Sequence, residues 1–198
     1  MWAAVGLGNP GKEYSGTRHN VGFSLIEILA KERNVRLKKK RYLSKTMVVD
    51  MAGDRVLLAL PQTYMNNSGQ AVKRIMDEAG IAPENTIIIY DDLDIPLGEI
   101  RVRKEGGAGS HRGMRSIVES TQAKKFPRIR IGIGPMDPHW DAADFVLSSF
   151  TKEEQPVIVE SLNKAQDALE LILGDGIEAA MTTYNLRKKD RKETEELL

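Results

Sequence analysis

The sequence predicts a single α/β domain, built on a mixed, twisted sheet with helices on both faces. Short apolar or β-branched runs, typical of strands, alternate with segments in which apolar residues recur at helical spacing. Two strand-like runs are separated only by Ala52-Gly53-Asp54, which predicts a hairpin and so makes the sheet mixed. The length of 198 residues suits one domain.

Six segments have the pattern of strands. The first is an apolar run that ends in glycine and proline, two flank the hairpin turn, and the fourth is β-branched. The last two alternate polar with apolar residues. In chain order the six are residues 2–7, 47–51, 55–60, 86–90, 99–103 and 128–133.

Helical spacing of apolar residues marks the segments between and after these strands. The spacing is found in residues 21–29, 72–76, 114–118, 157–173 and 177–184. Gly80 would end the second helix, and residues 174–176 interrupt the last helical region. Side chains that can accept hydrogen bonds from a first turn precede the first three helices, namely Thr17, Asn67 or Ser68, and Ser110.

We expect one domain over residues 1–185 and a tail over residues 186–198. The tail is almost entirely charged from Arg187 onward and is expected to fray. No repeat, low-complexity linker or sharp change in composition marks a second domain.

The composition excludes several kinds of site. The chain has no cysteine, which rules out disulfides and thiolate metal sites. It has three histidines, His19, His111 and His139, and their spacing matches no zinc motif. The first residues lack the basic region of a signal peptide, and no apolar run is long enough to cross a bilayer. We therefore expect a cytoplasmic protein without metal, cofactor or membrane contact.

Basic residues are concentrated in two parts of a chain whose net charge is only +1. Either group alone is typical of solvated surface, but two together indicate a polyanionic partner. The first group is Lys31, Arg33, Arg36, Lys38, Lys39, Lys40, Arg41 and Lys45, and the second is Arg101, Arg103, Lys104, Arg112, Arg115, Lys124, Lys125, Arg128 and Arg130.

Residues 6–11 match the G-x-G-x-x-G string of dinucleotide-binding proteins and follow a predicted strand. That mechanism needs the glycines to open a helix whose N-terminus holds a pyrophosphate. Pro10, Gly11 and Gly16 would interrupt such a helix, and no second strand ending in an acid follows within twenty residues. The context therefore argues against a nucleotide site.

Three small polar residues follow predicted strands: Asn9, Asn66 and Asp91. Each alone is explained by the preference of Asn and Asp for turns. If the strands are parallel neighbours, however, all three side chains meet at the carboxyl edge of the sheet, where open α/β sheets bind ligands.

His19 is the predicted general base. The loop before it is short, so the imidazole cannot lie far from the same edge of the sheet. An aspartate beside an imidazole fixes its tautomer and favours the imidazolium that proton abstraction forms. A helix N-terminus opposes that charge and keeps the resting ring neutral. Without cysteine, a G-x-S-x-G motif or a metal site, the nucleophile is water, and an activated acyl bond such as an ester is the expected substrate.

A glycine-rich segment covers residues 106–113. It is explained either as a flexible turn or as a loop that lets a ligand approach the backbone closely. Arg101, Arg103 and Lys104 lie just upstream, where they could meet phosphates. His139 has no such neighbours and is interpreted as structural.

Taken together, these motifs resemble the bacterial-type peptidyl-tRNA hydrolases. The similarity runs in order over residues 1–185, and the combination is far more specific than any single motif. The segments that carry it are residues 5–14 (VGLGNPGKEY), 17–22 (TRHNVG), 61–69 (PQTYMNNSG), 91–94 (DDLD), 109–113 (GSHRG) and 130–134 (RIGIG).

The resemblance implies hydrolysis of the ester between a peptide and the 3′ end of tRNA, which recycles tRNA from prematurely released chains, by a monomer. It implies that His19 is the base, that Asp91 holds it in its basic form, and that Asn9 reads the blocked α-amino group. It implies that Asn66 binds the tRNA end and helps to stabilise the oxyanion. The other residues expected to contact the substrate or the tRNA are Tyr14, Tyr64, Met65, Arg103, Lys104, His111 and Arg112.

Position 112 departs from the family pattern, which has Asn after the histidine where this chain has Arg112. A guanidinium suits phosphate better than it suits the ordering of water. The substitution keeps a second hypothesis open, a non-catalytic RNA-binding module on the same fold. A third, a nucleotide-dependent oxidoreductase, predicts measurable binding of NAD(P).

Overall fold

The computed structural model describes residues 1–185, so the predicted fraying tail lies outside the described residues. The strands form one sheet in the order β2-β3-β4-β1-β5-β7-β6. They are β1 (Trp2–Gly6), β2 (Lys39–Arg41), β3 (Ser44–Met51), β4 (Asp54–Pro61), β5 (Thr86–Pro96), β6 (Ile100–Arg103) and β7 (Arg128–Gly134).

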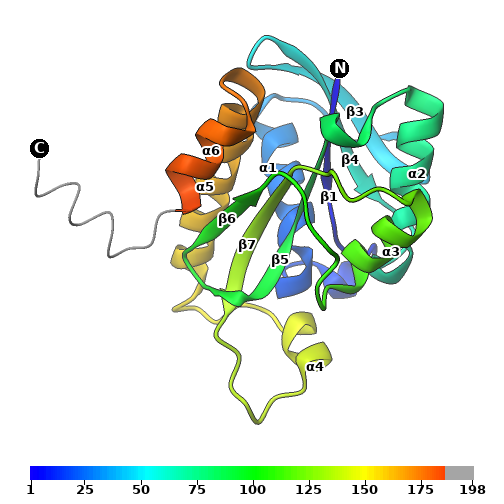
Figure 1. The fold of residues 1–198 in the computed structure, drawn as a ribbon. Helices are drawn as coiled ribbons and strands as arrows, with labels where there is room; N and C mark the ends of the chain where they lie inside the picture. Colours follow the sequence, from blue (N-terminus) through cyan, green and yellow to red (C-terminus); the bar gives the residue numbers. More distant parts are fainter. Residues whose placement is uncertain (186–198) are drawn as a thin grey trace, which may run out of the picture.

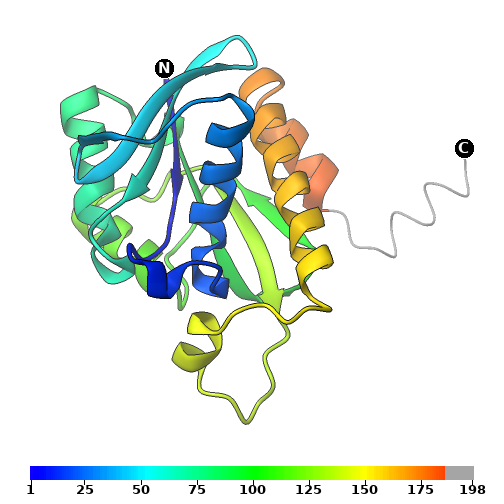
Figure 2. The ribbon, with the colours of Figure 1, turned by 180° about the vertical axis from the view of Figure 1, so that it is seen from behind.

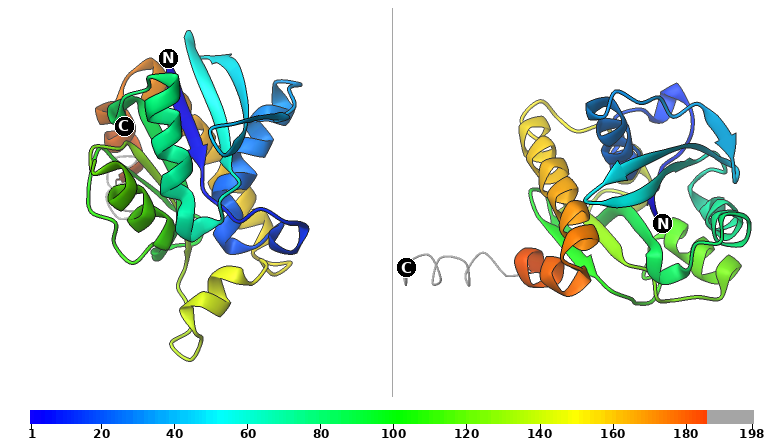
Figure 3. Two further views of the ribbon diagram at one scale, coloured as in Figure 1. Left: turned by 90° about the vertical axis from the view of Figure 1, so that its right-hand side faces the viewer. Right: turned by 90° about the horizontal axis from the view of Figure 1, so that it is seen from above.

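Helices cover both faces of this sheet, as the sequence predicted (Figures 1 and 2). Helices α1, α5 and α6 pack on one face and α2 and α3 on the other, with the sheet between them (Figure 3). The helices are α1 (Val21–Glu32), α2 (Ser68–Ala79), α3 (Arg112–Thr121), α4 (Ala142–Leu147), α5 (Gln155–Gly174) and α6 (Ile177–Asn185). The predicted α/β class with a mixed sheet is confirmed.

The centre of the sheet is parallel and its two margins are antiparallel. β4, β1, β5 and β7 run in the same direction, whereas β3 pairs antiparallel with β4 and β6 with β7. The predicted hairpin joins β3 to β4 through Ala52 and Gly53, both with positive φ, which suits a tight turn between twisted strands. The central strands therefore deliver their carboxyl ends to one edge.

Alternating residues of the central strands enter two different cores. Ala4, Ile87 and Ile89 belong to the core under α1 and α5, while Val5 and Ile88 belong to the core under α2 and α3. These strands are buried on both faces because helices cover both, which explains why they read as continuous apolar runs.

Several boundaries differ from the predicted ones. β5 continues to Pro96, and β2 was not predicted, because Lys39–Arg41 is exposed on both faces and has no apolar alternation. Thr17 does not cap α1, which begins at Val21. It precedes a 3-10 turn, and its hydroxyl donates to the carbonyl oxygen of Tyr14. The cap of α3 is His111 and not Ser110.

At the carboxyl edge of the sheet, α4 projects beyond the strands (Figures 1 and 2). The 3-10 turn Arg18–Asn20, the turn Met65–Asn67 and the glycine-rich loop before α3 lie at the same edge. Within residues 1–185, no helix has the length and apolar character that crossing a membrane requires.

Candidate active site

A cavity of about 710 Å³ opens at this edge. It is bounded by the turns after β1 and β4, by the glycine-rich loop and by α4. The predicted residues Asn9, His19, Asn66 and Asp91 all line it. Parallel pairing of β1 with both β4 and β5 brings these chain segments together, as the sequence predicted.

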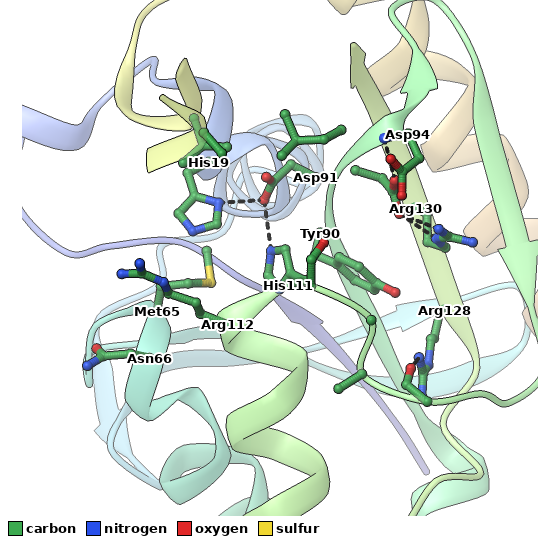
Figure 4. Close-up of a pocket in the computed structure, with 18 of the residues that line it drawn as sticks. His19, Met65, Asn66, Tyr90, Asp91, Asp94, His111, Arg112, Arg128 and Arg130 are labelled. Carbon is green, nitrogen blue, oxygen red and sulfur yellow. Dashed lines mark hydrogen bonds and ion pairs between the residues drawn. The ribbon is translucent and has the colours of Figure 1, made fainter. Parts of the chain in front are cut away.

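His19 and Asp91 form a buried hydrogen bond in which Nδ1 of the imidazole lies 2.8 Å from Oδ1 of the carboxylate (Figure 4). The side chain of Asp91 is 2% exposed and that of His19 is 11% exposed. Because an ionised carboxylate only accepts hydrogen bonds, Nδ1 carries the proton. The other ring nitrogen, Nε2, has no partner among the described residues and is available as a base.

His111 binds the same carboxylate oxygen, with Nε2 3.0 Å from Oδ1 of Asp91. Its other nitrogen, Nδ1, accepts from the backbone N–H of Met114 and caps α3. The ring is thus a neutral imidazole with the proton on Nε2, donating to Asp91. His111 was expected to contact substrate, but both of its nitrogens are engaged within the protein.

The charge of Asp91 is stabilised by these two rings. Burial alone raises the pKa of a carboxyl group, but the interactions of Asp91 with His111 and His19 outweigh it and hold the pKa of Asp91 well below its usual range. Asp91 is consequently an anion at neutral pH. It can stabilise an imidazolium at His19 without taking a proton itself.

The amide of Asn9 has a defined orientation. Its Oδ1 accepts from the backbone N–H of Met65 at 2.8 Å, which leaves the two N–H bonds of Nδ2 available to the cavity that Asn9 lines. The backbone of Asn9 is held on both sides by the side chain of Asn20, which accepts from its N–H at 2.9 Å and donates to its carbonyl at 3.0 Å. The role of Asn20 had no distinct signal in the sequence.

The glycine string at residues 6–11 serves the packing of α1 on β1. A Cβ on Gly6 would lie 2.1 Å from the carbonyl oxygen of Gly22, and one on Gly8 would lie 2.6 Å from the ring of Phe23. The chain then enters short 3-10 turns and not a long helix. These contacts account for both glycines without a nucleotide.

Tyr64, Met65 and Asn66 line the cavity next to one another along the chain, and Figure 4 shows Met65 and Asn66 on the same side of it. Tyr64 is half exposed and has a φ of 56° with a ψ of 160°, a conformation that residues with a side chain rarely adopt. Its ring meets that of Tyr14 edge-on at 6.3 Å. Tyr14 itself does not line the cavity.

The opposite end of the cavity is basic. Arg103, Arg128 and Arg130 line it, but two of these guanidinium groups have partners already. Arg128 is buried and donates to the carbonyl oxygens of Gly106 and Gly107, and Arg130 pairs with Asp92 at 2.5 Å. Arg103 has no such partner among the described residues.

Lys104 lies apart from this end. Its Nζ is 2.8 Å from Oε1 of Glu178 on α6, both side chains are largely exposed, and Lys104 does not line the cavity. Arg101 does not line the cavity either, and its guanidinium pairs with Glu99 at 2.9 Å. Of the three upstream cations that could meet phosphates, only Arg103 lines the cavity.

His19, Asp91 and His111 form a group whose potential ligand atoms lie within 4.8 Å of one another. Sequence spacing did not reveal this group, because its members come from three separate elements. The donor set does not fit a metal ion. Nδ1 of His111 accepts from a backbone N–H, so its Nε2, the nitrogen facing Asp91, carries the proton and has no free lone pair.

The apolar wall provided by α4 was not predicted, because residues around Trp140 gave only a helical pattern. Ala142, Ala143, Val146 and Leu147 line the cavity. Arg18 ties α4 to the turn that carries His19. Its guanidinium lies 4.5 Å from the ring of Phe145 and pairs with Glu154 at 2.6 Å.

Comparison with known proteins identifies the family. The family model described as peptidyl-tRNA hydrolase matches residues 3–194. The peptidyl-tRNA hydrolase of Alkaliphilus metalliredigens is 46% identical over 185 residues, covering 93% of this chain and 100% of the relative. That of Chloroflexus aggregans is 47% identical over 186 residues, covering 93% and 99%.

A solved structure agrees with these sequence matches. The crystal structure of peptidyl-tRNA hydrolase from Acinetobacter baumannii superposes with a TM-score of 0.87 at 36% identity, covering 95% of this chain and 96% of that one. The chain therefore belongs to the peptidyl-tRNA hydrolase family, whose members are hydrolases of the ester bond of peptidyl-tRNA.

Proposed function

We propose that this protein cleaves the ester between a peptide and the 3′ end of tRNA by means of a water molecule that His19 activates. The observation that carries the proposal is the hydrogen bond from Nδ1 of His19 to Asp91, which leaves Nε2 free to accept a proton at the cavity. Water attacks the ester carbonyl carbon as Nε2 takes its proton. The carbon–oxygen bond to the ribose then breaks, and the 3′ oxygen takes that proton from the imidazolium.

Asn9 reads the blocked α-amino group through its Nδ2. A peptidyl group differs from an aminoacyl group by an acyl carbonyl on the α-nitrogen, and a carbonyl oxygen accepts from an N–H donor. A free ammonium group has no acceptor to offer. Because Oδ1 of Asn9 is already bonded to Met65, the amide cannot turn to present an acceptor instead without losing that hydrogen bond.

The part of the cavity lined by Tyr64, Met65 and Asn66 receives the terminal nucleoside. An exposed tyrosine ring stacks on an unpaired base, and Tyr14 supports the ring of Tyr64 from the side. The carboxamide of Asn66 lies at the cavity, where it donates to the oxyanion that forms on the ester carbonyl.

Arg103, at the basic end of the cavity, binds phosphate of the acceptor stem, and Lys104 adds a more distant positive charge. The protein acts as a monomer in the cytoplasm, where translation supplies peptidyl-tRNA. The competing hypothesis is an RNA-binding module without activity, for which Arg112 is the only specific observation.

One assay separates the two hypotheses. Purified protein is incubated with N-acetyl-aminoacyl-tRNA and, in parallel, with the same tRNA carrying a free amino acid. We expect rapid deacylation of the first and little of the second. Tight tRNA binding without deacylation of either would favour the RNA-binding module.

A further inference from the structure

Arg112 lies at the catalytic end of the cavity and not at its basic end. In Figure 4 its guanidinium is on the side of His19, Met65 and Asn66, while Arg128 and Arg130 lie on the far side of Tyr90 and His111. Arg103 belongs to that far side, because it lies directly opposite Arg128 in the antiparallel register of β6 and β7. The cavity therefore carries positive charge at two separate places.

Arg112 is also an uncommitted cation. Among residues 1–185 it has no ion pair or side-chain hydrogen bond, and it is exposed. Two of the acids that line the cavity are already bound, Asp91 by two histidines and Asp92 by Arg130. A guanidinium without a partner at the wall of a cavity is a ready donor for an anionic group of a ligand.

The start of α3 adds to this positive charge. Arg112 is the first residue of the helix. Nδ1 of His111 accepts a hydrogen bond from the backbone N–H of Met114. The N–H groups of Arg112 and Gly113 have no acceptor among the described residues. The side chain of Arg112 and the N-terminus of α3 both add positive charge to this end of the cavity.

We infer that Arg112 binds the 5′ phosphate of the 3′-terminal nucleotide of the substrate. The inference rests on the proposed function, which puts the ester at His19. In a nucleotide the 5′ phosphate is joined to the 3′ oxygen through one ribose, so the phosphate nearest the ester belongs to the same nucleotide. Arg103, at the other end of the cavity, binds a phosphate of the acceptor stem instead. A neutral Asn in place of Arg112 would not supply the charge.

The inference is tested with two minimal substrates that differ by this one phosphate. One is the N-acetyl-aminoacyl 3′ ester of adenosine, and the other is the same ester of adenosine 5′-monophosphate. For the unaltered protein at low salt, kcat/KM for the phosphorylated ester is expected to be about 10- to 100-fold higher, the effect of one charge-assisted hydrogen bond. In Arg112→Asn the ratio should fall to about one, and Arg112→Lys should restore part of it.

Arg115→Asn is the matched control, because Arg115 is an exposed cation on the same helix that does not line the cavity. This variant should keep the full ratio. Arg103→Gln should keep the ratio too, because neither minimal ester contains the stem phosphate assigned to Arg103. A ratio that stays unchanged in Arg112→Asn, or that is lost in Arg103→Gln instead, would overturn the inference.

Competition provides a second measurement if the minimal esters react too slowly. Adenosine 5′-monophosphate should inhibit cleavage of N-acetyl-aminoacyl-tRNA with an inhibition constant about tenfold lower than that of adenosine, as one charge-assisted hydrogen bond predicts. Arg112→Asn should remove the difference, and persistence of the difference would refute the inference. Absence of tRNA cleavage by the unaltered protein would instead contradict the proposed function itself.

Discussion

His19 and Asp91 are separated by 72 positions in the sequence, yet Nδ1 of the first lies 2.8 Å from Oδ1 of the second. The bond fixes the tautomer in which Nε2 of His19 is free to accept a proton. It also places an anion beside the ring that becomes positively charged in the proposed mechanism. We therefore expect substitution of either residue to change the rate of hydrolysis, and substitution of Asp91 to change its dependence on pH as well.

Replacing His19 with Ala should lower kcat by about 10²- to 10⁴-fold, because a base acts in the transition state, and should leave tRNA affinity nearly unchanged. The measurement is single-turnover deacylation together with filter binding. His139→Ala is the control, since His139 is exposed and lies outside the cavity. Activity of His19→Ala within tenfold of the unaltered protein would remove it from the mechanism.

Asp91→Asn should fold and lose much of its rate, because an amide cannot stabilise the imidazolium as a carboxylate does. The acid limb of the kcat/KM profile should also move to lower pH. Removing the anion makes protonation of the ring less favourable, so the base stays active in more acidic solution. Asp50→Asn, an exposed site on β3, is the control. If the acid limb of the kcat/KM profile of Asp91→Asn stays at the same pH as that of the unaltered protein, the carboxylate does not influence the base.

Two substitutions distinguish the effects of the two hydrogen bonds that His111 makes, one to the carboxylate of Asp91 and one from the backbone N–H of Met114. Both substitutions remove the bond to buried Asp91, so both variants should lose rate and some stability. Asn is a favourable N-cap, whereas Ala is not, so His111→Ala should be about 0.5–2 kcal/mol less stable than His111→Asn. Rates and thermal unfolding of both variants are measured together. Equal stability loss in the two would show that capping does not matter here.

Asn9→Asp tests the orientation of the amide. An aspartate oxygen can still accept from Met65, but the second oxygen has no hydrogen to donate to the acyl carbonyl. Cleavage of N-acetyl-aminoacyl-tRNA should fall by about 10²- to 10³-fold, as after loss of one well-placed donor. The preference over free aminoacyl-tRNA should shrink with it. Asn163→Asp, an exposed site on α5, is the control, and an undiminished preference in Asn9→Asp would contradict the assigned role.

Chelation should not change activity. The nitrogens of His19 and His111 that face Asp91 carry protons in its hydrogen bonds, so these three residues do not form an open ligand set. The rate is measured before and after dialysis against EDTA. Inactivation that zinc or magnesium reverses would show that the group in fact binds a metal.

The sequence by itself determined the fold class and the main elements, because these depend on local patterns. Continuous apolar runs such as residues 86–90 have the signature of strands covered on both faces, and the Ala52-Gly53 turn marked the hairpin. It also indicated that Asn9, Asn66 and Asp91 would meet, since carboxyl ends of parallel neighbours share an edge. Family resemblance, not local pattern, indicated the roles of the tyrosines.

Only the tertiary structure decided contacts between residues far apart in the chain. Local sequence does not encode that His111 shares the carboxylate of Asp91, that Lys104 pairs with Glu178, or that α4 forms an apolar wall. The strand β2 was missed for the same reason, since an exposed basic run becomes a strand only through pairing with β3. Such features depend on which side chains the packed elements bring within hydrogen-bonding distance, and propensity and spacing along one segment carry no information about that.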